Sequence, residues 1–294
     1  SNLEDNIVVF SPLSESDLFD DQTDVIPSWN LDSNEESNFD IIINKLVELN
    51  ITSLAIQFNY GFYNFECFSK FIHKVSKLDI NIVVFFHSTS DPIHDQSKKL
   101  ISLFDALKCV DRILVHTLSD LNNLKDIGLI DNVMLFPHGI LEYDKLSQDD
   151  YKNLFFSLSS KRKIASFGFL LPHKGIIELI QAIDILRSDN FIVELNLITS
   201  IYNKNDLSFY NEVLKSIVSL ELTSLVSLNT EYLSDQDSLD LLAINDLIVF
   251  PYQNSQESSS ASVRHGLATG KPVLVTPIDI FKDIANVVNF SSGT

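Results

Sequence analysis

The segment ASFGFLLPHKGIIELIQAIDIL, residues 165–186, contains the change of pattern that decides the fold. A short apolar run ends near Gly168, a loop follows, and apolar residues then recur at helical spacing after Gly175. A strand that leads through a loop into a helix is the repeating unit of a parallel α/β sheet. Free N–H groups and the helix dipole would favour a phosphate beside Lys174. A tight turn with a solvated lysine is the alternative interpretation.

The same alternation of short apolar runs and helical segments extends along the chain. Strands are expected at 7–10, 53–58, 81–87, 112–117 and 132–137, and again at 163–169, 193–199, 224–230, 246–252, 271–276 and 286–290. Helical spacing is clear in NFDIIINKLVEL and in SKKLISLFDALKCV, whereas residues 11–38 fit no element. The pattern predicts an α/β protein with two Rossmann-like domains, 1–155 and 156–294, facing a central cleft.

Charge and composition exclude several classes of function. The 294 residues include 40 acidic and 21 basic side chains, a net charge of −19 that repels nucleic-acid backbones. No apolar run is long enough to span a membrane. The two cysteines, Cys67 and Cys109, are far apart, which favours reduced thiols in a cytoplasmic protein. No spacing resembles a zinc site, and no G-x-G-x-x-G indicates a dinucleotide oxidoreductase.

A second loop also carries candidate ligands. In QNSQESSSASVRHGLAT, one of several serines would cap a helix, and small side chains leave its first N–H groups accessible. Glu257 would stand beside that helix and could accept hydrogen bonds from sugar hydroxyls. The alternative is that Glu257 only complements the helix dipole and binds no ligand. In the first half, Asn59 and Tyr60 follow a strand and are candidates for the acceptor side.

Three segments taken together resemble one family. FGFLLPHKGIIELIQAI, LIVFPYQNSQESSSASVRHGLATGKPVLVT and VHTLSDLNNLKDIGLIDNVMLFPHGI resemble the retaining nucleotide-sugar glycosyltransferases of family 4, which have the GT-B fold. The resemblance covers roughly residues 80–290 and is nearest to bacterial O-antigen and polysaccharide mannosyl- or rhamnosyltransferases. Because this fold normally continues with further helices, we expect the C-terminal domain to be truncated.

The resemblance implies roles for individual residues. Lys174 would neutralise the donor diphosphate, Glu257 would contact the transferred sugar, and His87 would lie near the reacting centre. The implied donor-binding set is Gly168, Phe169, His173, Lys174, Glu257, Ser258, Ser259, Ser260, Arg264 and His265.

Two positions depart from the family pattern. Phe169 stands where the family usually has arginine, and His265 stands where a second glutamate would bind the ribose. Arg264 could replace the lost charge, although neighbouring helical residues point about 100° apart, so we expect at most one of Arg264 and His265 to face the donor.

The activity implied is transfer of a hexose, such as mannose, with retention and without a metal or other cofactor, in synthesis of cell-surface polysaccharide. The donor would be GDP-, UDP- or dTDP-linked, and the acceptor a glycan or lipid-linked glycan. The location would be cytoplasmic, with peripheral association at the inner membrane face or membership of a larger multidomain chain left open. The alternatives are an inactive glycan- or nucleotide-binding module of a larger protein and a GT-B sugar-nucleotide epimerase.

Overall fold

The computed structural model describes residues 7–13, 24–144, 161–203 and 206–292. The chain divides into two compact units, which we call unit 1 (Ser1–Pro137) and unit 2 (His138–Thr294). The boundary expected from the sequence, between residues 155 and 156, lies outside the described residues. Each unit is a parallel α/β structure, which confirms the predicted fold class.

Unit 1 contains a two-stranded and a four-stranded parallel sheet. Strands β1 (Val8–Pro12) and β2 (Asp24–Trp29) form the first, and the second has the order β3-β4-β5-β6. Its elements are β3 (Ser53–Phe58), β4 (Asn81–Phe86), β5 (Arg112–Val115), β6 (Val133–Leu135), α1 (Asp40–Glu48), α2 (Phe65–Val75), α3 (Phe104–Leu107) and α4 (Leu118–Asp126). Sequence analysis missed β2 because Pro27, which cannot donate to a sheet, interrupts its strand pattern.

The core of unit 1 lies between the four-stranded sheet and the helices that follow its strands. Phe58 of β3 and Phe86 of β4 are fully buried, with ring centroids 4.4 Å apart, and Phe68 of α2 packs against Phe58. Exposed and buried residues alternate along β3, so among the described residues only one face of this strand is covered. This differs from the coverage on both faces that is usual for parallel α/β sheets.

The helix expected over residues 97–110 is broken. Residues Gln96–Lys98 (η3) and Leu100–Leu103 (η4) form 3₁₀ turns, and only α3 is α-helical. Lys99 adopts an extended conformation (φ −81°, ψ 122°) between the two turns. The side chain of Lys98 is buried, and its amine pairs with Asp32 and donates to the carbonyl oxygen of Tyr63. Tertiary contacts of Lys98 therefore replace the continuous helix that apolar spacing predicts.

Unit 2 contains a six-stranded parallel sheet in the order β12-β11-β10-β7-β8-β9. Its strands are β7 (Arg162–Phe169), β8 (Val193–Ser200), β9 (Val226–Asn229), β10 (Leu247–Phe250), β11 (Val273–Val275) and β12 (Asn289–Phe290). The helices between them are η5 (Pro172–Lys174), α6 (Ile176–Ser188), α7 (Ser208–Ser219), α8 (Asp235–Ala243), α9 (Ala261–Ala268) and η6 (Asp279–Ile284).

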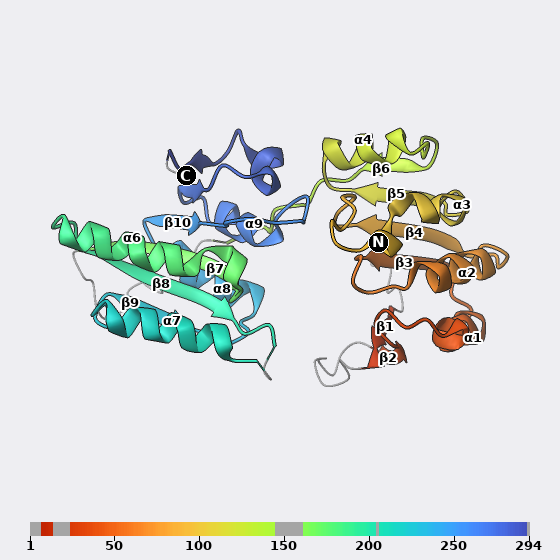
Figure 1. Cartoon of the computed structure of the whole chain (residues 1–294), viewed down its shortest axis with the longest axis horizontal. Helices are drawn as coiled ribbons and strands as arrows, with labels where there is room; N and C mark the ends of the chain where they lie inside the picture. The colour runs from red at the N-terminus through yellow and green to blue at the C-terminus, as the bar shows by residue number, and fades with distance from the viewer. Residues whose placement is uncertain (1–6, 14–23, 145–160, 204–205, 293–294) are drawn as a thin grey trace. The chain divides into compact units, whose positions relative to one another are not determined.

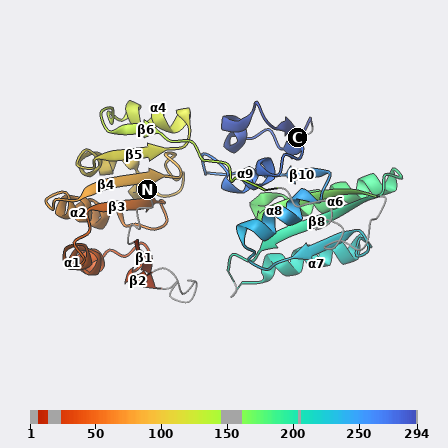
Figure 2. The ribbon, with the colours of Figure 1, turned by 180° about the vertical axis from the view of Figure 1, so that it is seen from behind.

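Helices cover both faces of this sheet. Helices α6 and α7 pack together on one face (Figure 1), and α8 and α9 pack together on the other, which is seen from behind in Figure 2. Two separate apolar clusters result, one containing Ile180 and Val213, the other Leu242 and Phe250. None of the helices within the described residues combines the length and apolar character needed to cross a bilayer.

Candidate functional site

The two loops singled out from the sequence meet at one edge of unit 2. The strand order reverses at β7, because β8 and β9 continue on one side and β10, β11 and β12 lie on the other. Where the order reverses in a parallel α/β sheet, the carboxyl ends of the strands leave a crevice that commonly binds ligands. Residues 170–175 follow β7 and residues 251–260 follow β10, so both loops lie at this position.

A glycine allows the two loops to come into direct contact. Gly175 has φ +73°, and a Cβ atom at this position would lie 1.8 Å from the carbonyl oxygen of Pro251. The backbone N–H of Gln253 also donates to the carbonyl oxygen of His173, at 2.9 Å. Only glycine satisfies both the left-handed backbone and the close approach. The relative position of the loops is therefore fixed by backbone contacts.

Lys174 is held over an aromatic ring at this junction. Its Nζ atom lies 3.9 Å from the ring centroid of Tyr252, which is only 1% exposed. The Tyr252 hydroxyl is 3.4 Å from the Oγ atom of Ser260, and its carbonyl oxygen accepts a hydrogen bond from Thr276. Among the described residues, no carboxylate pairs with the Lys174 amine. Within this part of the chain, the amine is thus positioned over the ring and has no carboxylate partner.

The serine loop is secured from its buried side. Ser260 caps α9 by accepting from the N–H of Val263, and Ser259 donates to Asp283. Arg264 pairs with Asp283 and donates to the carbonyl oxygen of Ser260 at 2.6 Å. Arg264 is 5% exposed and its charge is matched by Asp283, so its placement does not support the predicted donor contact. We assign it the role of positioning the serine loop.

The pKa of His173 is affected by charges of both signs. Burial lowers its pKa, the Lys174 amine lowers the pKa further, and the Glu257 carboxylate opposes both effects. Glu257 is exposed, and its backbone N–H donates to Ser255 Oγ. The amine and the acid therefore act on the pKa of one histidine in opposite directions.

An aromatic pair occupies the ends of β7 and β8. Phe169 is 40% exposed, Tyr202 is 66% exposed, and their rings meet edge to face with centroids 5.3 Å apart. Gly168, with φ +126°, precedes them, and a Cβ atom there would lie 3.0 Å from Ser262 Oγ. Where the family resemblance implies arginine, this chain has an exposed pair of aromatic rings.

His265 contacts Asp235 and Phe167. Its Nε2 atom is 3.0 Å from Asp235 Oδ1, and its ring centroid is 4.7 Å from that of Phe167. Its side chain is half-buried and its contacts differ from those of the adjacent, buried Arg264. A contact between His265 and a donor stays a prediction.

The candidates of unit 1 also follow strand ends. His87 Nε2 is 2.8 Å from Gln57 Oε1, and the His87 ring centroid is 5.3 Å from that of His116. Asn59 accepts from the N–H of Gly61 within its own turn. Tyr60 donates to Asp91, and burial together with that carboxylate raises its pKa. Asn59 and Tyr60 therefore support the loop after β3, and their acceptor role stays a prediction.

Sequence analysis missed two residues that build the unit 2 site. Tyr252 supplies the ring beneath Lys174, and Asp283 anchors both Ser259 and Arg264. An aromatic residue two positions after β10 is a visible signal for Tyr252. Asp283 lies in η6, far from any motif, and no local pattern marks it.

The glycine contact predicts a difference between two alanine substitutions. Gly175→Ala should destabilise the protein by about 3 kcal/mol or more, because both the backbone conformation and the Pro251 carbonyl oppose a side chain. Gly270→Ala is the matched control, since Gly270 has φ +69° but no atom within 4 Å of its added Cβ, and should cost about 1–2 kcal/mol. Urea unfolding measures both, and equal losses would contradict the proposed close approach.

The charges around His173 predict opposite shifts of one pKa. Lys174→Met should raise the His173 pKa and Glu257→Gln should lower it, while Glu212→Gln on the exposed face of α7 should leave it unchanged. Proton NMR of the imidazole measures each value. Because the folded pKa is lowered from 6.5, the unfolded chain binds the proton more readily, and this histidine should weaken folding as the pH falls below that value. If both variants shifted the His173 pKa in the same direction, Glu257 would not belong to this site.

Comparison with known proteins finds similarity in structure only. No protein-family model and no curated protein matches the sequence. A glycosyltransferase from Rickettsia africae ESF-5 has 16% identity and a TM-score of 0.67, over 90% of this chain and 68% of that one. HepE from Anabaena, solved in complex with UDP-glucose, has 15% identity and a TM-score of 0.66, over 91% and 72%.

An α,α-trehalose-phosphate synthase (UDP-forming) from Burkholderia vietnamiensis is also similar, with 10% identity and a TM-score of 0.65 over 85% of this chain and 64% of that one. At such low identities the likeness concerns the path of the chain. The protein therefore has the fold of the GT-B glycosyltransferases.

Proposed function

We propose that the protein is a glycosyltransferase that takes a hexose from a nucleoside-diphosphate sugar and transfers it to a hydroxyl group of a glycan. The observation that carries the proposal is the amine of Lys174, which no carboxylate of the described residues pairs with and which is held over Tyr252 where the strand order of unit 2 reverses. A cation there, beside the start of a 13-residue helix, suits a diphosphate.

The start of α6 supplies further donors for phosphate. Gly175 is its N-cap residue and makes no side-chain capping bond, so the N–H groups of the first turn are not occupied by a cap. The helix dipole adds partial positive charge at the same end. Lys174 and these N–H groups would together stabilise the charge that develops on the leaving diphosphate.

The neighbouring acid suits the sugar. Glu257 is exposed and carries a carboxylate that can accept hydrogen bonds from two adjacent hydroxyls. His173 has a lowered pKa, so it is neutral at pH 7 and can donate one hydrogen bond without adding charge. One edge of unit 2 thus presents cationic groups for the diphosphate and neutral or acidic groups for a hexose.

Finer features of the proposal rest on the family 4 resemblance. These are retention of the anomeric configuration by same-face attack, independence of metal, His87 near the reacting centre, and a role in polysaccharide or O-antigen synthesis. We place UDP first among the nucleotides to test, ahead of GDP and dTDP, because HepE was solved with UDP and UDP-glucose and the trehalose-phosphate synthase is UDP-forming. The exposed faces of Phe169 and Tyr202 would favour stacking where the resemblance implies a charge.

A non-catalytic nucleotide-binding module is the second candidate. Phe169 favours it, because one of the two cations that the resemblance implies for the diphosphate is missing. Loss of a cation beside the leaving diphosphate weakens stabilisation of the transition state. It has less effect on nucleotide binding that depends on stacking of the base. Release of UDP from UDP-glucose by the purified chain supports the transferase, and binding without any turnover supports the module.

The proposal predicts separate losses for the amine and the acid. Lys174→Ala should weaken UDP binding about 10- to 100-fold, since it removes a charge-assisted contact with the phosphates. Glu257→Gln should leave UDP affinity unchanged but lower UDP release from UDP-glucose about tenfold or more. Calorimetry and a coupled UDP assay measure the two effects.

The control is Lys215→Ala, which removes an exposed lysine from α7 in the same unit. It should bind and turn over donor like the unaltered chain. If Lys174→Ala and Lys215→Ala weakened UDP binding equally, the phosphate site would not lie at the start of α6.

A further inference from the structure

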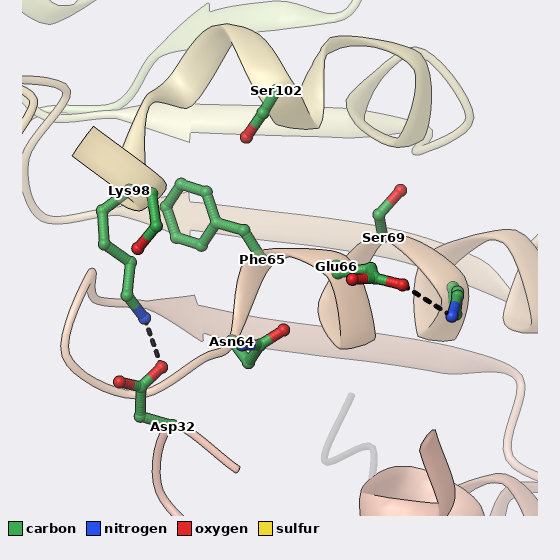
Figure 3. Close-up of a pocket in the computed structure, with 9 residues that line it drawn as sticks. Asp32, Asn64, Phe65, Glu66, Ser69, Lys98 and Ser102 are labelled. Atoms are coloured by element: carbon green, nitrogen blue, oxygen red, sulfur yellow. Dashed lines mark hydrogen bonds and ion pairs between the residues drawn. The ribbon is translucent and has the colours of Figure 1, made fainter. Parts of the chain in front are cut away.

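Unit 1 contains a groove of about 580 Å³ that the sequence did not reveal. It lies between the first half of α2 and the broken segment η3–η4, with Asp32 at one end (Figure 3). These three walls follow β3, β4 and β2 respectively. The groove therefore opens at the carboxyl ends of parallel strands, the usual location of ligand sites in such sheets. Its volume falls in the range of small-molecule sites.

One end of the groove is built around an ion pair whose lysine is buried and whose carboxylate is exposed. Lys98 is 7% exposed, and its amine pairs with Asp32, donates to the Tyr63 carbonyl oxygen and lies 5.3 Å from the ring centroid of Phe65. Asp32 is held in a left-handed conformation (φ 49°), and its N–H donates to Phe62. Since the charge of Lys98 is already matched, this end is polar but not an anion site.

The other end is polar and exposed. Lys70 pairs with Glu66 at 2.8 Å and with Glu36, and these two carboxylates raise its pKa. The charges of this end are thus also matched within the protein. Neither end presents the excess positive charge that a phosphate or a nucleotide needs.

Hydroxyl groups line the space between the two ends. Ser69 on α2 and Ser102 on η4 point into it from opposite walls (Figure 3). Ser102 donates to the carbonyl oxygen of Lys99, at 2.7 Å, so its oxygen is left to accept from a ligand. Ser97, also at the groove, donates to Asp95 in the same way. The groove combines acceptors, carboxylates and matched amines, and the ring of Phe65, which is only 5% exposed, is among its lining residues.

This lining matches one ligand chemistry. A neutral sugar has several hydroxyls that each donate and accept, and a ring whose C–H groups pack on apolar surface. A charged ligand would leave one of the matched pairs unbalanced. We propose that the groove is a carbohydrate subsite that binds a neutral sugar of the acceptor glycan. That the sugar belongs to the acceptor rests on the proposed function, whereas sugar binding itself does not.

The test uses the full chain without any nucleotide. Methyl α-glucopyranoside, methyl α-mannopyranoside and methyl α-rhamnopyranoside are titrated separately to about 50 mM, a range suited to millimolar affinity. Amide resonances are followed by ¹H–¹⁵N NMR. We expect at least one sugar to shift the amides of residues 64–70 and 96–102. No shift with any of the three sugars, or shifts confined to other residues, would overturn the proposal.

Two blocking variants locate the site. Ser69→Trp fills the groove from α2, and Ser102→Trp fills it from the opposite wall, so a folding defect in one leaves the other informative. Each should weaken sugar binding about tenfold or more. Ser76→Trp, at the exposed end of α2 outside the groove, is the matched control and should bind normally. Unchanged binding in a folded blocking variant would place the sugar elsewhere.

Two further measurements separate this inference from the proposed function. The blocking variants should bind UDP as the unaltered chain does, because the groove and Lys174 belong to different units. Sugar binding that persists in Lys174→Ala would support the groove even if UDP binding failed. Inorganic phosphate should leave the groove amides unshifted, and a phosphate response larger than that of the sugars would overturn the neutral assignment.

Discussion

The approach of Gly175 to the carbonyl oxygen of Pro251 is the contact on which the unit 2 site depends. It brings the loop after β7 against the loop after β10 without any side chain between them. Once the backbones touch, the Lys174 amine has the ring of Tyr252 beneath it, and the Tyr252 hydroxyl reaches the residue that caps α9. A cation ordered in this way loses less conformational freedom when an anion arrives.

Charge is distributed unevenly in this acidic chain. The net charge of −19 would repel a free nucleotide sugar, so a phosphate site requires local cations whose charge is not already matched. At the candidate site of unit 2, Arg264 and Lys174 make different contacts. Arg264 pairs with Asp283 and fixes the serine loop, while no carboxylate among the described residues pairs with Lys174. In unit 1, by contrast, the lysines at the groove are matched by carboxylates, which suits an uncharged partner.

The groove of unit 1 and the candidate site of unit 2 arise from local departures from regular structure. A continuous helix over residues 97–110 would satisfy the apolar spacing, but Lys98 is drawn into contacts with Asp32 and Tyr63, and the backbone turns at Lys99. The resulting pair of short turns forms one wall of the groove. At the candidate site of unit 2, a positive φ at Gly175 ends η5 and begins α6. Both sites are therefore formed where a regular element is interrupted.

The sequence alone determined the alternation of strands and helices, the parallel sheets and the two loops at the carboxyl ends of β7 and β10, because these follow from hydrophobic periodicity and glycine positions. Only the tertiary structure decided which charged side chains are paired within the described residues. Arg264 and Lys174 are equally basic in the sequence, but Asp283, distant in the chain, neutralises the first, and Tyr252 supports the second. The pairing of Lys98 with Asp32, across 66 residues, likewise has no local signature. Hydrophobic periodicity predicts which face of each element is buried. Contacts between residues far apart in the sequence decide which charged side chains form ion pairs.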